Sequence, residues 1–303
     1  MTALNIHYDF LIVGNGSIGT YSALALKQKF INKKVGIIGN RQRQGSASVA
    51  AGAMAAVYGE VEACCESHTE LEAKYLSVGV RARPLWKDFL NKTASQDVIT
   101  SKSTIVFLKK DYSEYEEKNF EACAKAAIRD NAGTMLSQLE TNKLFPHTSK
   151  SIDRAVKLHD EFSMCTTLLF KRLDLFCENE KIDHIGQNVI EIDPKTMTVK
   201  TKEDTYTASK IIVAAGAQTT EIIKDEGIIP MLQGVGTALL IKTNDPKLNF
   251  LTEHVFRSVN RGGSNCGLHC LPRSDGSLYV GAGNYVSNLG ESGYRFESIR
   301  YLL

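Results

Sequence analysis

The stretch FLIVGNGSIGTYSALALKQK, residues 10–29, decides the fold, because it predicts a strand, a glycine turn and a helix in direct succession. Its first residues, 10–14, form a continuous apolar run, which is typical of a strand buried on both faces in a parallel sheet. Gly14, Gly16 and Gly19 then have the spacing GxGxxG. The first glycine permits a tight turn, the second lets the backbone approach a pyrophosphate, and the third lets the helix pack against the strand.

The context of these glycines predicts a dinucleotide site rather than a chance turn. Apolar residues recur at helical spacing after the turn: Ile18, Tyr21, Leu24 and Ala25. The N-terminus of such a helix offers unpaired N–H groups and the positive end of its dipole to a phosphate. A second apolar stretch, residues 34–39, follows the helix and predicts the next parallel strand.

The end of this second strand lacks a residue that dinucleotide-binding folds normally have. Such folds place Asp or Glu there to bind a ribose hydroxyl, whereas this chain has Gly39 followed by Asn40. Asn40 can accept and donate hydrogen bonds without a full charge. Because no acid would repel a 2′-phosphate and Arg41 and Arg43 follow, this stretch alone leaves NADP open.

The next segment favours a flavin. Eleven of the residues in 41–62 are Gly, Ala or Ser. Small residues at this density let the backbone contact a large flat ligand, and Ser46 and Ser48 add hydroxyl groups. A flexible linker is the alternative, but a linker would not normally contain the interleaved Val49 and Met54.

Three blocks of the sequence together resemble the D-amino-acid oxidase / glycine oxidase-like family of FAD-dependent oxidoreductases. The blocks are residues 14–19, the small-residue segment 45–54, and KIIVAAGAQTTEI at 210–222. In similar enzymes the second block runs past the pyrophosphate to the isoalloxazine ring, and the third closes on the cofactor at Gly216. Where the family has its acid, this sequence has Gly39.

The resemblance implies FAD as the cofactor and oxidation of a C–N bond in an amine or amino acid. A hydride would pass to flavin N5, and the electrons would continue to oxygen or another acceptor. Met54 and Arg273 are the candidate substrate contacts. A guanidinium such as that of Arg273 matches a carboxylate in a bidentate way, and a solvent-exposed arginine of the turn is the alternative for this residue. The predicted cofactor contacts are Gly14, Gly16, Ser17, Ile18, Gly19, Asn40, Arg41, Ser46, Ala47, Ser48, Ala51, Gly52, Ala53, Met54, Val189, Ala215 and Gly216.

The expected fold class is α/β, with a Rossmann-like FAD-binding domain and a second, α+β substrate domain built on a mainly antiparallel sheet. We expect the FAD-binding domain at residues 1–95 and 159–225. The substrate domain is expected at residues 96–158 and 226–303.

Two local features belong to this expectation. Residues 63–92 predict a long amphipathic helix broken near Pro84. Its expected apolar face contains Leu71, Tyr75, Leu76, Val80, Leu85, Trp86 and Phe89. The pair Asp275–Gly276 between two apolar stretches predicts a hairpin turn.

The sequence stops at SGYRFESIRYLL, residues 292–303, where similar oxidases continue. The C-terminal segment that covers the flavin in such enzymes is absent from it. Three explanations stay open: a fragment of a longer protein, a short form completed by a partner subunit or a second copy, and a non-catalytic relative.

Composition narrows the classes of partner. The 303 residues carry a formal net charge of only +2, with acids and bases mixed along the chain, which argues against a nucleic-acid surface. The sequence shows no signal peptide before the first strand and no apolar stretch long enough to span a membrane. Seven cysteines without framework spacing favour free thiols and a cytoplasmic protein.

Two other classes of function remain as alternatives. An NAD(P)-dependent dehydrogenase would share the glycine turn but would not need the small-residue segment. A catalytically inactive flavoprotein-like subunit would bind a partner or a ligand. His68 and His159 lack metal-ligand spacing, so no metal is expected, while Cys64, Cys65 and His68 leave a covalent link to a flavin open.

Overall fold

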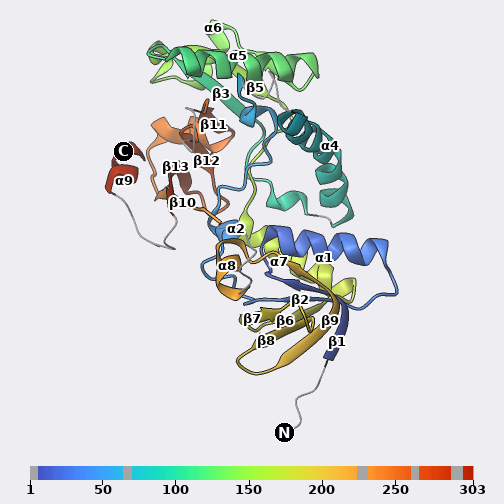
Figure 1. Cartoon of the computed structure of the whole chain (residues 1–303). Helices are drawn as coiled ribbons and strands as arrows, with labels where there is room; N and C mark the ends of the chain where they lie inside the picture. The colour runs from blue at the N-terminus through green and yellow to red at the C-terminus, as the bar shows by residue number, and fades with distance from the viewer. Residues whose placement is uncertain are drawn as a thin grey trace. The chain divides into compact units, whose positions relative to one another are not determined.

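The computed structural model describes residues 6–63, 70–93, 95–223, 231–260, 266–287 and 296–302. The chain folds as two compact units (Figure 1). The first unit contains Met1–Ala51 and Thr166–Gln233, and the second contains Gly52–Cys165 and Gly234–Leu303. The chain therefore passes between the units three times.

A six-stranded sheet forms the centre of the first unit, with the strand order β6-β2-β1-β9-β8-β7. Strands β6, β2, β1 and β9 are parallel to one another. Strand β8 pairs antiparallel with both β9 and β7. β1 lies in the middle, and its Leu11, Ile12 and Val13 are buried as the sequence predicts, whereas Ile6 and Phe10 are only partly buried. The strands are β1 (Ile6–Val13), β2 (Val35–Ile38), β6 (Asp183–Ile185), β7 (Val189–Asp193), β8 (Thr198–Thr201) and β9 (Thr205–Val213).

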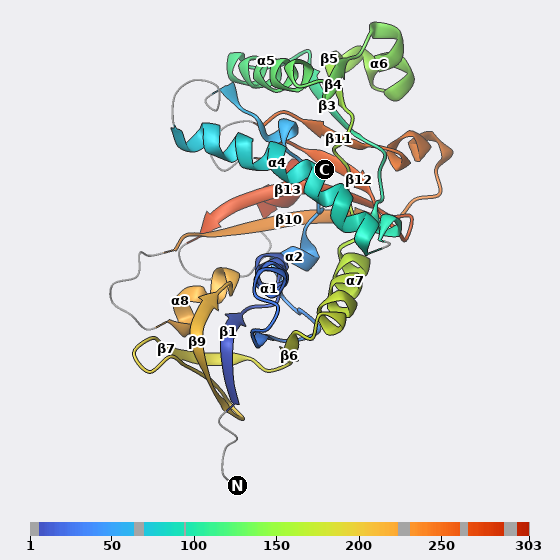
Figure 2. The same ribbon diagram turned by 90° about the vertical axis from the view of Figure 1, so that its right-hand side faces the viewer.

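Helices α1 (Ser17–Lys29) and α7 (Thr166–Asn179) contact each other and the parallel strands, so they lie side by side on one face of this sheet (Figures 1 and 2). The short helices α2 (Ala47–Ala50), η4 (Gly216–Gln218) and α8 (Thr219–Ile222) complete the unit.

The apolar face expected for α1 is wrong in part. The helix buries Gly19, Thr20, Ala23 and Leu24, whereas Ile18 is 71% exposed and Ala25 is also exposed. Small side chains face the sheet because this helix packs close to the strands, and that requirement overrides the spacing of the larger residues.

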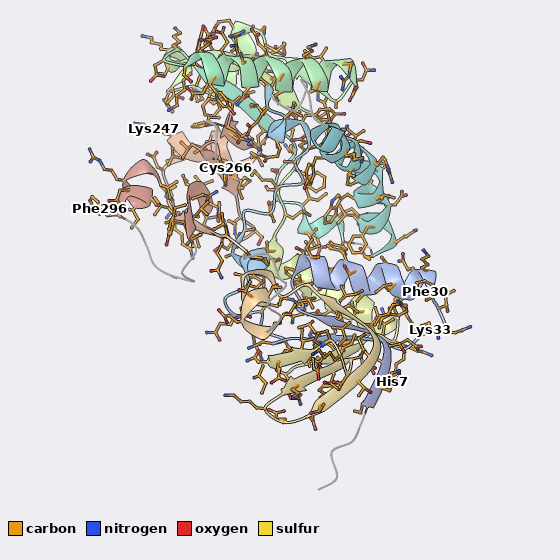
Figure 3. All side chains as sticks on the ribbon, in the orientation of Figure 1. His7, Phe30, Lys33, Lys247, Cys266 and Phe296 are labelled. Carbon is orange, nitrogen blue, oxygen red and sulfur yellow. The ribbon has the colours of Figure 1, made fainter. Side chains whose placement is uncertain are left out.

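The turn after α1 is tied to β1. Phe30 stacks on Phe10 with ring centroids 5.3 Å apart, and Lys33 pairs with Asp9 at 2.8 Å (Figure 3). Lys27 donates to the carbonyls of Ile31 and Lys33. The basic residues at this helix end therefore close the turn and stabilise the negative end of the dipole.

The second unit is built on a seven-stranded sheet with the order β10-β13-β12-β11-β3-β5-β4. β11 and β3 pair in parallel, whereas β11–β12, β12–β13, β3–β5 and β4–β5 pair antiparallel, which confirms the mainly antiparallel sheet. The strands are β3 (Thr104–Lys109), β4 (Gly133–Met135), β5 (Ile152–Leu158), β10 (Gln233–Ile241), β11 (Val255–Ser258), β12 (His269–Pro272) and β13 (Leu278–Ser287).

The hairpin turn between β12 and β13 forms where Asp275–Gly276 predicts it. Gly276 has φ +78, and its N–H donates to the Arg273 carbonyl at 3.1 Å. Asp275 accepts from the Ser277 hydroxyl at 2.6 Å. The turn therefore uses both the left-handed freedom of glycine and the side-chain acceptor of aspartate.

Helix α5 (Glu114–Arg129) packs along β3 and β4 and buries a face of small residues and Phe120 (Figure 1). The other helical segments of this unit are η1 (Tyr58–Glu60), α4 (Glu70–Lys92), η2 (Gln96–Val98), α6 (Gln138–Leu144), η3 (Ser149–Ser151), η5 (Pro246–Thr252) and α9 (Phe296–Leu302).

Two expectations for the long helix are wrong. Helix α4 continues through Pro84 instead of breaking there. Pro84 is exposed, so water can bind the backbone carbonyl that its missing N–H leaves unpaired. Tyr75 and Leu85 of the expected apolar face are 72% and 64% exposed.

The compact units divide the chain at residues other than the expected domain boundaries. Residues 52–95 and 159–165, expected in the FAD-binding domain, pack in the second unit. Residues 226–233, expected in the substrate domain, belong to the first unit. The assignment of cofactor and substrate binding to separate domains stays a prediction.

The capping box of α5 gives a stability prediction. Ser113 accepts from the Glu116 N–H at 3.3 Å, and Glu116 accepts in return from the Ser113 N–H at 2.9 Å. Replacing a serine cap by alanine costs about 1 kcal/mol. We expect Ser113→Ala to lower the free energy of unfolding by that amount in urea denaturation followed by circular dichroism. Ser149→Ala, at a serine whose side chain does not cap its short helix, should have little effect.

Candidate functional site

The turn between β1 and α1 brings three segments into backbone contact. Gly14 has φ +109, and a Cβ on it would lie 2.3 Å from the Ala214 carbonyl oxygen after β9. A Cβ on Gly19 would lie 1.8 Å from the Gly14 oxygen. Neither position accepts a side chain without moving backbone, so these glycines set how closely strand and helix approach.

The N-terminus of α1 is surrounded by small groups and hydroxyls. Gly16 is its N-cap and provides no side-chain acceptor, and the first turn of the helix has no acidic residue. The Ser17 N–H donates to Ser48 Oγ at 3.1 Å. A Cβ on Gly16 would lie 3.1 Å from Ser48 Oγ and 3.8 Å from Ser46 Oγ. The positive end of the helix dipole therefore faces a cradle without a carboxylate, which suits an anion.

The first and third sequence blocks meet at this turn. The Ala214 N–H donates to the Val13 carbonyl at 2.7 Å, so the chain after β9 runs beside the end of β1. Gly216 follows with φ +58, and no atom lies within 4 Å of where its Cβ would be. Ala215 and Val189 pack against the core of this unit.

Asn15 and its neighbours occupy the carboxyl ends of β1, β2 and β6. Asn15 Nδ2 donates to the Asn40 carbonyl at 2.6 Å and lies 3.3 Å from His184 Nε2. Asn40 Oδ1 accepts from the Gln42 N–H at 2.8 Å. Ligands bind in α/β sheets at this edge, outside the carboxyl ends of the strands.

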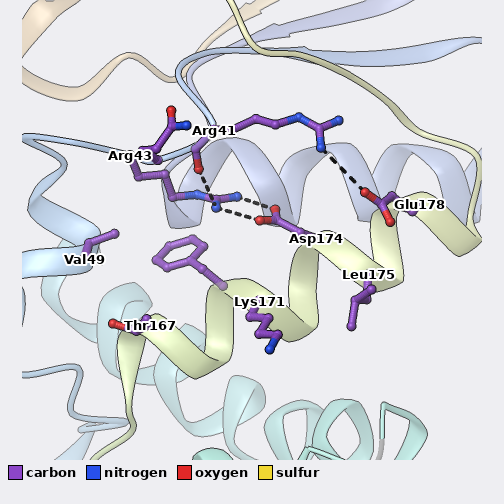
Figure 4. A pocket seen from close by; sticks show the side chains of 10 residues that line it. Arg41, Arg43, Val49, Thr167, Lys171, Asp174, Leu175 and Glu178 are labelled. Atoms are coloured by element: carbon purple, nitrogen blue, oxygen red, sulfur yellow. Dashed lines mark hydrogen bonds and ion pairs between the residues drawn. The ribbon is translucent and has the colours of Figure 1, made fainter.

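Arg43 ties the glycine turn to α7. Its Nε donates to the Asn15 carbonyl at 2.7 Å, and its two terminal nitrogens bind the Asp174 carboxylate at 2.8 and 2.5 Å (Figure 4). The guanidinium also lies 4.4 Å from the centroid of the Phe170 ring. Arg43 is buried and fully engaged, so it holds the turn in place instead of offering its charge to a ligand.

Arg41, expected as a cofactor contact, points toward Glu178 of α7 at 3.8 Å (Figure 4). Both side chains are more than half exposed. They border a pocket of about 330 Å³ within the first unit. The lining residues are Arg41, Gln42, Arg43, Val49, Thr167, Phe170, Lys171, Asp174, Leu175 and Glu178.

Gly52, Ala53 and Met54, also expected as cofactor contacts, belong to the second unit. Ala53 has φ +53, which is uncommon for a residue with a side chain. Its carbonyl accepts from the Met164 N–H at 3.0 Å, and Met54 forms an antiparallel bridge with Ser163. Ala51 is the last residue of the first unit before this point.

Arg273, the expected substrate contact, is half-buried beside the β12–β13 turn. Its backbone N–H donates to the Ser277 carbonyl at 2.8 Å, and its guanidinium lies 5.9 Å from the centroid of the Tyr279 ring.

A buried charged cluster of the second unit was missed by sequence reasoning. Arg257 is 1% exposed, pairs with Glu60 and donates to Asn260 Oδ1 at 3.0 Å. Glu161, also 1% exposed, accepts from the N–H groups of Val57 and Tyr58 at 2.8 and 2.5 Å. An arginine inside the apolar strand VFRS was the available signal, since a charge there needs a buried partner.

Among the helices of the described residues, none has both the length and the apolar character needed to cross a bilayer. The described ranges contain no group of three or more His, Cys, Asp or Glu side chains that could hold a metal ion. Cys64, Cys65 and His68, considered for a covalent flavin link, lie outside the described residues.

The sequence profile of the family described as "FAD dependent oxidoreductase" matches residues 9–303. The chain belongs to this family. Among curated proteins it is similar to monomeric sarcosine oxidase of Bacillus sp. (strain B-0618), with 23% identity over 246 residues. That alignment covers 77% of this chain but only 58% of the relative, so the chain spans less than two thirds of its length.

Solved structures confirm the fold. Glycine oxidase from Geobacillus kaustophilus has a TM-score of 0.76 and 17% identity, covering 98% of this chain and 76% of that one. L-alpha-glycerophosphate oxidase from Mycoplasma pneumoniae, solved with FAD bound, has a TM-score of 0.74 and 21% identity, covering 98% and 77%. L-proline dehydrogenase from P. horikoshii has a TM-score of 0.73 and 14% identity, covering 99% and 76%.

The family membership confirms the expected family, fold class and FAD cofactor, and it favours a flavin over a nicotinamide as the dinucleotide. The first unit also fits the cofactor on its own geometry. A Cβ on Gly16 would enter the space before the hydroxyls of Ser46 and Ser48. Gly16 gives α1 no side-chain cap, so an anion can bind N–H groups that a helix N-terminus otherwise leaves to water.

Gly16→Val tests this cradle. The branched side chain would fill the space before Ser48 Oγ, so we expect FAD binding at least about tenfold weaker than in the unmodified chain. Flavin fluorescence titration measures the change. Gly234→Val is a matched control, because no atom lies within 4 Å of a Cβ at that position. Unchanged affinity in Gly16→Val would place the pyrophosphate elsewhere.

The Glu60–Arg257 pair gives a pH prediction. The Glu60 side chain is 45% exposed, so desolvation opposes its ionisation only in part, and the buried Arg257 guanidinium holds the pKa of the carboxyl below its usual value. This contribution to stability is present above the unfolded pKa and is lost as the pH falls through the folded one. Between roughly pH 5 and 3, the free energy of unfolding should fall less steeply with decreasing pH in Glu60→Gln than in the unmodified chain.

The control for this measurement is Glu297→Gln on the exposed side of α9, which should leave the profile unchanged. Burial raises the pKa of Glu161, so this carboxyl changes the free energy of unfolding with pH in the opposite direction. The unmodified chain and both variants contain Glu161, so its effect cancels in the comparison. An identical profile in Glu60→Gln would mean that the pair does not contribute to acid sensitivity.

Proposed function

We propose that the chain binds FAD through its first unit and that the protein oxidises the C–N bond of an amine or amino acid. One observation carries the proposal: α1 begins at Gly16, which provides no side-chain cap, its first turn has no acid, and the hydroxyls of Ser46 and Ser48 lie beside it. The pyrophosphate of FAD has the charge and size that this cradle accepts.

In this proposal, α1, Ser48 and Arg43 each contribute to binding or positioning the phosphates. The dipole of α1 and the N–H groups of its first turn stabilise the phosphate charge. Ser48, which already bonds the Ser17 N–H, places its hydroxyl beside the same phosphates. Arg43 binds the Asn15 carbonyl and Asp174, and so keeps the turn from moving when the anion arrives.

Bound FAD would supply the two-electron chemistry, with N5 as acceptor of a hydride from the carbon beside the substrate nitrogen. Met54 and Arg273 remain the proposed substrate contacts. Arg273 is half-buried, whereas Arg257 is 1% exposed and pairs with Glu60. Sarcosine oxidase and glycine oxidase, to which the chain is similar, are named for substrates of this class.

The test is the visible absorption spectrum of the purified chain, followed by heat release and chromatography of any bound flavin. Anaerobic addition of amines and amino acids should then bleach the flavin absorbance. Bound FAD that is bleached by these compounds is the expected result. Bound FAD that none of them bleaches would support an inactive flavoprotein subunit. A colourless chain that takes up no added FAD would overturn the proposal.

A further inference from the structure

Asn15, the residue between the first two glycines, is held through both its backbone and its side chain. Its backbone carbonyl accepts from Arg43 Nε at 2.7 Å and from Thr20 Oγ1 at 3.1 Å. Its Nδ2 donates to the Asn40 carbonyl and lies near His184 Nε2. Only the amino group can face a carbonyl, so the hydrogen-bond pattern itself fixes which amide atom is the oxygen.

The oxygen of this amide lies over Gly39, at the end of β2. A Cβ on Gly39 would lie 3.1 Å from both Asn15 Oδ1 and Asn15 Cγ. Gly39 is not among the glycines with positive φ, so its backbone conformation does not require glycine. The space is tight instead, because the Asn15 amide would have to give way by a few tenths of an ångström to a Cβ at position 39.

Asn15 Oδ1 is an acceptor that the described residues leave open. Asn15 is 7% exposed, and its Oδ1 accepts no hydrogen bond within the described ranges. Asn15 Oδ1 keeps some contact with solvent, because the side-chain atoms that are both fully buried and without a hydrogen bond belong to other residues. Burial lowers the pKa of His184, which favours the neutral imidazole, whose Nε2 can accept from Asn15 Nδ2 at 3.3 Å.

We propose that Asn15 Oδ1 accepts a hydrogen bond from a ribose hydroxyl of the adenosine half of FAD, in place of the acid that position 39 lacks. The atom lies at the carboxyl end of β2, where dinucleotide-binding folds read the ribose with a carboxylate. Asn15 is thus a specificity-determining residue that recognises the hydroxyl by an uncharged acceptor. This inference rests on the proposed FAD site.

A purely structural Asn15 would act through Nδ2 alone, by holding the turn to β2. The two roles belong to different atoms of one amide, so variants separate them. Asn15→Ala removes both atoms. Asn15→Asp keeps an acceptor oxygen but loses the donor to the Asn40 carbonyl. Asn15→Ala combined with Gly39→Glu frees the space at position 39 and returns the acid to the end of β2.

The experiment is isothermal titration calorimetry of the full chain, freed of flavin, with ADP, 2′-deoxy-ADP and 3′-deoxy-ADP. The unmodified chain should bind ADP about two- to tenfold more tightly than one of the deoxy analogues, as expected for one hydrogen bond. Asn15→Ala should lose this preference. Asn15→Asp should keep it at a lower thermal stability, and the Asn15→Ala/Gly39→Glu protein should regain it.

Two outcomes would overturn the inference. One is an unmodified chain that binds ADP and both deoxy analogues equally. The other is an Asn15→Ala protein that binds all three nucleotides more weakly by the same factor and keeps the preference. In both cases uptake of FAD by the unmodified chain would leave the proposed function standing. A chain that binds neither ADP nor FAD would remove the two together.

Discussion

The close approach of backbone at the β1–α1 turn is the constraint on which the first unit depends. A side chain on Gly14 or Gly19 would collide with backbone oxygen, at Ala214 and Gly14 respectively. Because no atoms separate them, the end of β1, the start of α1 and the residues after β9 hold fixed positions relative to one another. The cradle at Gly16 and the amide of Asn15 are both placed by this contact.

Arg43 also holds this turn in place, through hydrogen bonds and an ion pair instead of close backbone contact. Its guanidinium is 5% exposed and is neutralised by Asp174, which is one-third exposed. Removing one partner of a buried pair leaves a desolvated charge, at a cost of roughly 3 kcal/mol. The turn that faces the pyrophosphate is therefore held by α7, a helix that itself would not touch the cofactor's phosphates in this proposal.

The parts of the fold that follow local rules were predictable from sequence. The glycine spacing predicts β1, α1 and β2, and the Asp275–Gly276 turn predicts the last hairpin, because each depends on neighbouring residues. The exposure of Ile18 was not predictable, since it depends on how closely α1 approaches the sheet. The break expected at Pro84 was wrong because solvent satisfies the backbone there.

In the candidate site, too, contacts between neighbours in sequence could be predicted and contacts between distant residues could not. Gly16, Ser46 and Ser48 could be found from their composition and order. The pairing of Arg43 with Asp174 joins residues 131 positions apart, and that of Arg257 with Glu60 joins residues 197 apart. No local pattern reports such contacts. The relation of Asn15 to Gly39 was predictable only in part. The sequence showed that the acid expected after β2 is missing, but it did not show that the Asn15 side chain lies beside that position.

The central position of β1 has a consequence during synthesis on the ribosome. Its one edge is covered early by β2, but its other edge waits for β9, and His7 and Thr207 stand 200 positions apart. At 5–20 residues per second, that delay is roughly 10–40 s. For this time an apolar strand keeps an unpaired edge that can join another nascent chain.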